Sequence, residues 1–214
     1  MHNWEKYVRL DKTNFYYFKK FCIKKFGADI GNLINVEAES KLSEMIKEAD
    51  YRSSKYIKWH MDKNMLPSIA IYLTFKEFKS IADKAYDYTD EVLQIYRLKN
   101  RRKNLAIGRL PFGYFAFKIF CRSVVKKQYP EQGWNMEWIQ YNKNEIHFNM
   151  KSCIYFETTK KYNCTEMCQL FCANDDVILT GYNPAIVFER KGTIAQGQNI
   201  CDFHFKNRNY TKRV

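Results

Sequence analysis

The sequence lacks any apolar run of about 18 residues, the length that a helix needs to cross a membrane. The N-terminal segment carries charges throughout and has no apolar core that would mark a secretory signal. We therefore expect a protein without membrane contact, located in the cytoplasm, where cysteine thiols stay reduced.

Several motifs of common enzyme classes are also missing. The sequence contains no Gly-rich phosphate loop, no HExxH and no Gly-x-Ser-x-Gly. These absences argue against the commonest nucleotide-binding enzymes, zinc proteases and serine hydrolases. No repeat or low-complexity linker divides the 214 residues, which suffice for one domain or for two small ones that share an interface.

Acidic residues are the minority among the charges: there are 23 Asp and Glu against 36 Lys and Arg, for a net charge of +13. The cations are spread over the whole chain, so the excess does not favour a nucleic-acid partner, although it can attract anionic small molecules. The densest cluster is Arg97, Lys99, Arg101, Arg102 and Lys103. We expect this cluster at a solvated helix end, where cations favour the helix dipole; the alternative is a phosphate-contact site.

The first part of the chain has the three- and four-residue apolar spacing of helices. A first helix is expected between Thr13 and Gly27, and another around residues 42–49. The later expected helices are a stretch from Ile57 that breaks at Pro67, residues 76–98 with Ile95 facing inward, and the aromatic run 112–125. The segment 111–120 is expected either to form a pocket wall or to belong to the core.

The apolar pattern changes to period two near residue 130, which is typical of strands. Strands are expected at residues 134–140, 146–156, 178–181, 185–190 and 200–205, with a helix from Thr158 or Thr159 to Cys172. The predicted fold is α+β: an N-terminal helical half followed by a small antiparallel sheet with one inserted helix. We expect a helical region at 1–130 and the sheet region at 131–214, together one compact unit.

Five of the seven cysteines lie between residues 153 and 205. Cys164, Cys168 and Cys172 recur every four residues and would share one side of a helix, where they could bind metal or pack inward, or Cys172 could line a pocket. No C-x₂-C pair is present, and no His lies within that helix to complete a ligand set, so we expect no metal and no cofactor. Cys22 and Cys121 are expected to be small buried hydrophobes.

Three charged residues near these cysteines have two interpretations each. Asp175 and Asp176 form either a solvated turn or, for one of them, a buried general base or amine anchor. Arg190 ends an apolar strand, where it either pairs on the surface or binds a carboxylate with its forked guanidinium.

The segment 201–205, Cys-Asp-Phe-His-Phe, alternates as a strand. Cys201 and Phe203 would share one face, with Asp202 on the other. Cys201 is therefore either a nucleophile or a buried structural thiol, and a base for it would have to come from another element.

Several of these residues, in this order, resemble one family. The residues that carry the resemblance are Cys153, Tyr162, Glu166, Phe171, Cys172, Asp175, Phe188, Glu189, Arg190, Thr193, Gly197, Cys201, Asp202 and Phe203. The pattern resembles the L-2-amino-thiazoline-4-carboxylic acid hydrolase family over residues 134–206, and it extends upstream through residues 64–67. Cys164 and Cys168 lie outside it.

The resemblance implies hydrolytic opening of a small thiazoline ring in cysteine metabolism. It implies four catalytic candidates, Cys201, Cys172, Asp175 and Asp202. The implied substrate-binding candidates are Arg190, for the substrate carboxylate, together with Asp176 and Phe203. The alternative is a small-molecule binding or sensing protein without turnover; a homo-oligomer is left open.

Overall fold

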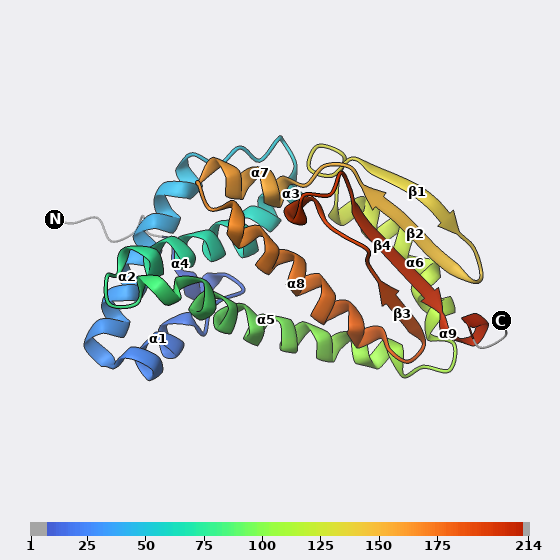
Figure 1. The fold of residues 1–214 in the computed structure, drawn as a ribbon, viewed down its shortest axis with the longest axis horizontal. Coiled ribbons are helices and arrows are strands. Elements are labelled where there is room, and N and C mark those ends of the chain that lie inside the picture. The colour runs from blue at the N-terminus through green and yellow to red at the C-terminus, as the bar shows by residue number, and fades with distance from the viewer. Residues whose placement is uncertain (1–7, 212–214) are drawn as a thin grey trace. The chain divides into compact units, whose positions relative to one another are not determined.

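In the computed structural model, residues 8–211 are described (Figure 1). The chain divides into two compact units, Met1–Tyr96 and Arg97–Val214. Within the described range, no helix is both long and apolar enough to span a membrane. The change from helices to strands falls between residues 128 and 136. The expected regional boundary at residue 130 remains a prediction.

The first unit is built from helices. Its elements are η2 (Leu10–Lys12), α1 (Phe18–Phe26), α2 (Ala28–Lys47), α3 (Lys55–His60), the π-helical turn η3 (Met61–Met65), α4 (Leu66–Glu77), η4 (Ala82–Lys84) and the start of α5 (Ala85–Gly108). Aromatic rings meet edge to face in its core, with Phe75 against both Phe18 (5.9 Å) and Phe26 (6.0 Å).

Gly27 ends the first helix, as expected, because its φ of 86° suits glycine. The expected break at Pro67 is wrong. A proline has no N–H to donate and is tolerated in the first turn of a helix. Pro67 is the second residue of α4, directly after the π-helical turn η3, where the Leu66 N–H already donates five residues back to the Met61 carbonyl. The N–H that proline lacks thus falls where the regular hydrogen-bond pattern is interrupted.

The expected helix over 76–98 is wrong at both ends. The helix α4 continues to Glu77, and α5 begins only at Ala85 and runs on to Gly108. Ile95 is 41% exposed instead of facing inward.

The second unit combines helices with one sheet. After the end of α5 it contains α6 (Gly113–Gln128), β1 (Met136–Tyr141), β2 (Glu145–Met150), α7 (Ile154–Lys161), η5 (Thr165–Met167), α8 (Cys168–Leu179), η6 (Thr180–Tyr182), β3 (Ile186–Glu189), η7 (Ile194–Gln196), β4 (Cys201–Asn207) and α9 (Arg208–Thr211). The sheet order is β1-β2-β4-β3, with antiparallel pairing throughout (Figure 1). The α+β fold class is thereby confirmed.

The segment between β2 and β3 holds two α-helices, α7 and α8, where one was expected. The strand expected to continue to residue 156 instead turns into α7 after Cys153. In this helix Ile154 and Thr158 are buried one turn apart, and the Thr158 hydroxyl donates to the Ile154 carbonyl at 2.7 Å. Burial with a period of four, not two, therefore decides the conformation.

The strand expected at 178–181 is also helical, at the end of α8 and in η6. Side chains from the second half of α5 donate hydrogen bonds to this end of the helix. The side-chain amide of Asn104 donates to the Ile178 carbonyl at 3.0 Å, and Arg101 Nε donates to Thr180 Oγ1 at 3.3 Å. Partners distant in sequence thus override the strand propensity of Val177 and Ile178.

The basic cluster lies inside α5 rather than at a helix end, so that expectation is wrong. Arg97 is only 3% exposed; its Nε donates to Asn174 Oδ1 at 2.7 Å and its Nη2 to the Leu170 carbonyl at 3.1 Å. At least two cations of the cluster, Arg97 and Arg101, thus attach α5 to α8 and η6. The phosphate-contact alternative remains a prediction for the others.

The two faces of the sheet divide as the alternation in β4 predicted. Phe203 stacks on Phe148 of β2 at 5.3 Å, on the same face as Phe205. His204 stacks on His147 at 4.6 Å on the other face. The Phe117 ring of α6 lies 5.1 Å from Phe205, so α6 covers the apolar face.

Gly181 is a position where close packing requires glycine. A Cβ added there would lie 2.5 Å from the Arg101 carbonyl oxygen of α5, which is backbone and cannot move freely. We expect Gly181→Ala to lower the free energy of unfolding by about 1–3 kcal/mol, measured by urea denaturation. Gly192→Ala is the matched control, because its Cβ would meet only the flexible Gln198 side chain. Equal stability of the two variants would contradict the packing argument.

Candidate functional site

An apolar cavity of about 400 Å³ lies in the second unit, enclosed by α6, the sheet and α8. It is lined by Ile107, Ala116, Phe117, Phe120, Cys121, Val124, Val125, Tyr129, Phe148, Met150, Asp175, Leu179, Tyr182, Phe203 and Phe205. Phe120 and Val124 are 64% and 51% exposed, so the cavity opens to solvent beside α6. Of the segment 111–120, expected to be either pocket wall or core, Ala116, Phe117 and Phe120 line this cavity, and Phe203 also lies in its wall.

Asp175 is the carboxylate that lines this cavity. Burial raises the pKa of Asp175 to about 6, while the positive charge of Arg190 opposes the shift. Asp175 borders the cavity and its side chain is 40% exposed, so the burial that raises its pKa is partial. The carboxylate therefore titrates in contact with the cavity, close to neutral pH.

Two elements that border the cavity, α8 and β4, also carry thiols. On α8, Cys168, Cys172 and Asp175 have the spacing of one helix face. On β4, Cys201 lies on the same strand face as Phe203, and it pairs in register with Met150 of the cavity wall. The thiols therefore gather next to the Asp175 end of the cavity.

This thiol cluster consists of Cys153, Cys168, Cys172 and Cys201. Cys168 lies within hydrogen-bonding reach of both Cys153 and Cys172, and this position between two thiols raises the pKa of Cys168. Because a thiol carries one hydrogen, Cys168 can donate to only one of these neighbours at a time. The other groups around Cys153 and Cys172 therefore decide which of these two thiols ionises.

Both neighbours have lowered pKa values: at Cys153 the backbone N–H groups of Phe156 and Tyr155 add to the hydrogen bond from Cys168, and at Cys172 a side-chain hydroxyl and a cation do so. The hydrogen bond from Cys168 lowers the pKa of Cys172, and the Thr193 hydroxyl and the positive charge of Arg190 act in the same direction. The buried Thr193 hydroxyl also donates to Gln196 Oε1 at 3.2 Å, so Cys172 and this amide oxygen share its single hydrogen. Burial and the charge of Asp175 oppose the shift. Of the two thiols with a lowered pKa, Cys172 is the one whose neighbours include Arg190 and Asp175, so it is the candidate for the reactive sulfur.

Cys201 has different surroundings. It is only 6% exposed, and burial raises its pKa to about 12. The backbone N–H of Ile194 donates to its sulfur at 3.3 Å, which offsets part of this effect. Cys201 is consequently a neutral thiol near pH 7, and its role as nucleophile remains a prediction.

Arg190 follows β3 directly, and its side chain is only 5% exposed. Its Nη2 donates to the Cys172 carbonyl at 2.7 Å and to Asp176 Oδ1 at 2.5 Å, and its Nη1 approaches Asp175 Oδ2 at 3.4 Å. The guanidinium also lies 5.4 Å from the centre of the Phe203 ring. The arginine thus attaches the end of β3 to the face of α8 that carries the thiols.

Asp202 lies on the opposite face of the sheet from the thiol cluster. Its Oδ1 is 2.6 Å from His147 Nε2, and its Oδ2 accepts from the Lys191 N–H at 3.2 Å. These residues border a separate pocket of about 280 Å³. The structure therefore brings Cys172, Asp175, Asp176, Arg190, Cys201 and Phe203 together and leaves Asp202 apart.

Three residues of the site were not among the catalytic or binding candidates: Cys168, and also Cys153 and Thr193, which carry the family resemblance. Cys153 was assigned to a strand and Cys168 to packing, whereas the structure joins them. Cys164 does not share a helix with Cys168 and Cys172, because it precedes η5, and its thiol donates to the Thr159 carbonyl at 3.4 Å. Among residues 8–211, no group of three or more His, Cys, Asp or Glu is placed to hold a metal ion.

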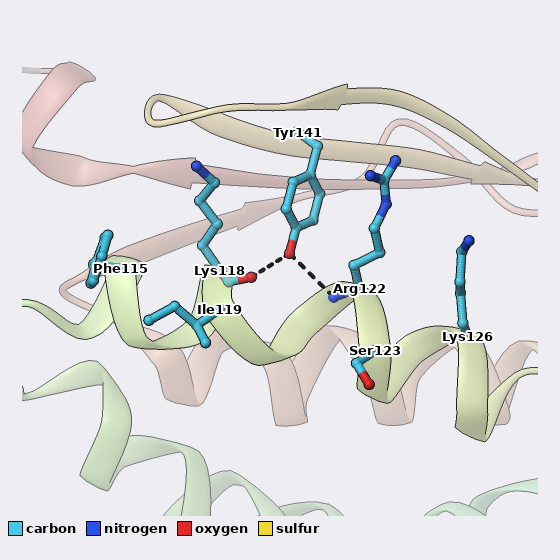
Figure 2. A pocket seen from close by; sticks show the side chains of 7 residues that line it. All are labelled: Phe115, Lys118, Ile119, Arg122, Ser123, Lys126 and Tyr141. Carbon is cyan, nitrogen blue, oxygen red and sulfur yellow. Dashed lines mark hydrogen bonds between the residues drawn. The ribbon is translucent and has the colours of Figure 1, made fainter.

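A second hollow, of about 460 Å³, lies on the opposite side of α6 (Figure 2). Figure 2 shows Lys118, Arg122 and Lys126 extending from successive turns of α6, with the Tyr141 ring between the first two. The Arg122 guanidinium lies 4.8 Å from the Tyr141 ring and 5.0 Å from the Trp138 ring. The hollow thus has cations and aromatic rings, but none of its lining residues is a thiol or carboxylate.

The surroundings of the thiols predict a difference in reactivity. Because a thiolate is the nucleophile, we expect iodoacetamide to modify Cys172 at a lower pH than an ordinary thiol requires, while Cys201 stays unmodified in the folded protein. Mass spectrometry of digested protein over a pH series measures both sites, and Cys121, whose pKa burial raises to about 12, is the internal control. Modification of Cys201 before Cys172 would contradict this assignment.

Comparison with protein families gives one match. The model of the family described as L-2-amino-thiazoline-4-carboxylic acid hydrolase matches residues 60–205, which include the apolar cavity and the thiol cluster. Searches of curated proteins and of solved structures found no match. Since the matched region is more than half of the chain, the protein belongs to the L-2-amino-thiazoline-4-carboxylic acid hydrolase family.

Proposed function

We propose that the second unit is a hydrolase that opens a small ring with a carbon bonded to nitrogen and sulfur, such as L-2-amino-thiazoline-4-carboxylate. The observation that carries this proposal is the position of Cys172, a thiol with a lowered pKa, one helical turn from Asp175 of the cavity wall. Family membership supports the reaction class. A role in cysteine metabolism in the cytoplasm belongs to the same proposal.

The proposed reaction begins with attack by the Cys172 thiolate on the ring carbon between nitrogen and sulfur. A bond forms between the two, and the tetrahedral intermediate collapses by breaking the bond from this carbon to the ring sulfur. The ring sulfur leaves with the bonding electrons and takes up a proton. Water then adds to the same carbon and expels Cys172, which leaves a urea group and a free thiol on the product.

Asp175 has the role of anchor in this scheme. One oxygen makes only a long contact with Arg190, and no hydrogen bond to the other is found within residues 8–211. The ionised carboxylate can therefore accept N–H bonds from the amidine-like end of a substrate in the cavity. This places the ring carbon near the α8 face that carries Cys172.

Arg190 is assigned as a positioning residue. Its donors already meet Cys172, Asp175 and Asp176, so we propose that it stabilises the thiolate and holds the anchor. Binding of a substrate carboxylate by Arg190 remains a prediction, as does substrate contact by Asp176. For Asp202 we propose a structural role, the ordering of the loop at Lys191.

The nucleophile assignment is tested with matched cysteine variants. We expect Cys172→Ala to lower kcat for L-2-amino-thiazoline-4-carboxylate by at least about a hundredfold, because the attacking atom is lost. Cys201→Ala is expected to retain more activity, and Cys164→Ser, which lies outside the thiol cluster, serves as the control. Substrate loss by mass spectrometry and thiol release are measured together, with circular dichroism as the check on folding.

Near-normal turnover by Cys172→Ala with loss of activity in Cys201→Ala would move the nucleophile to Cys201. Loss in neither variant would favour attack by water. Tight ligand binding by the wild-type protein without any turnover would favour the sensing alternative.

The pKa of Asp175 predicts the acid limb of the pH profile. The carboxyl is ionised above about pH 6 and loses its charge below it, so kcat/KM for a cationic substrate should fall as the pH drops through 6. In Asp175→Asn this limb should disappear, with low activity throughout. Glu137→Gln, which removes only an exposed partner of Lys151, should keep the limb. An unchanged acid limb in Asp175→Asn would refute the anchor.

A further inference from the structure

The apolar cavity does not match the charges of the substrate that names the family. That substrate carries a carboxylate, and a buried carboxylate needs a cation or several donors. No Lys, Arg or His lines the cavity as the described residues form it. Arg190, the nearest guanidinium, is occupied by its contacts with α8.

The size of the cavity also argues for a ligand other than the substrate that names the family. Pockets of roughly 300–1,000 Å³ usually bury ligands of drug size, and this cavity of about 400 Å³ falls in that range. A five-membered ring with an amino group and a carboxylate would leave much of it empty. The unfilled part is bordered by side chains of α6 and the sheet, among them Phe117, Phe148, Phe203 and Phe205.

Two other polar side chains of the cavity wall, Cys121 and Tyr182, add no charge to it. Burial raises the pKa of both Cys121 and Tyr182 to about 12, so both are neutral at pH 7. A ligand that fits such a surface has a positive charge at the Asp175 end and an apolar remainder.

We infer that the site takes a cationic amidine with an aryl-sized apolar substituent, the amidine end on Asp175 and the substituent between α6 and the sheet. For catalysis this inference rests on the proposed hydrolysis, and the corresponding substrate is a 2-aminothiazoline with an aryl or branched alkyl group in place of the carboxylate. For binding it stands independently, because the cavity and its single carboxylate are sufficient.

Three simple probes separate the contributions of head group and ring, measured by isothermal titration calorimetry on the full chain. Benzamidine has both features, acetamidine has the same charged head without the ring, and benzoate has the ring with the opposite charge. We expect benzamidine to bind at least tenfold more tightly than acetamidine and benzoate not to bind. Equal affinity for the two amidines, or binding of benzoate, would overturn the inference.

Val124→Lys tests the location, because Val124 borders the cavity yet is more than half exposed, so that a longer side chain can be accommodated. The added cation should weaken benzamidine binding at least tenfold. Ser123→Lys is the matched control, since the neighbouring side chain borders the hollow of Figure 2 and adds the same charge there. Equal weakening by both variants would show that overall charge, not the cavity, governs binding.

Turnover is compared with 4-phenyl-2-amino-2-thiazoline and L-2-amino-thiazoline-4-carboxylate. The inference expects a kcat/KM at least tenfold higher for the phenyl compound. A preference for the carboxylate would overturn it while leaving the proposed hydrolysis intact. If neither compound is consumed but the three probes bind in the expected order, the hydrolysis fails and the ligand class stands.

Discussion

Arg190 reaches from the end of β3 to α8, where its guanidinium donates to the Cys172 carbonyl and meets the carboxylates of Asp175 and Asp176. A buried guanidinium is costly unless it is paired and hydrogen-bonded, so these partners are required for its burial. The same contacts hold α8 against the sheet with Cys172 near Thr193. The proposed nucleophile and the proposed anchor thus share one electrostatic support.

That support explains why the residues of the site differ so much in ionisation. Cys172 lies beside a positive charge and hydrogen-bond donors, whereas Cys201 is buried and its pKa is raised mainly by that burial, with one backbone donor to offset it. The pKa of Asp175 is raised because the effect of burial outweighs that of its long contact with Arg190. Neighbouring thiols and carboxylates of the site therefore differ in the pH at which they ionise.

Much of this could be predicted from the sequence, where local pattern and tertiary structure agree. The alternation in β4 assigned Cys201 and Phe203 to the apolar face and Asp202 to the other, because strand parity is a local property. The predictions failed where partners that are distant in sequence determine the conformation or the site. The polar contacts of α5 with α8 and η6 keep residues 178–181 helical, and the thiol cluster depends on Cys153, which comes from a different element. Spacing along the chain carries no signal for such contacts.

We propose that the apolar cavity and the thiol cluster form one site, in which Asp175 holds an amidine within reach of Cys172. The most direct test is labelling with 2-chloroacetamidine, which joins an amidinium to an alkylating carbon; the attacking sulfur forms a bond to this carbon and chloride leaves. The account predicts modification of Cys172 alone, mapped by mass spectrometry, with protection by benzamidine and loss of the rate advantage over iodoacetamide in Asp175→Asn. Modification of Cys201 or of thiols outside the cluster, unaffected by benzamidine, would contradict it.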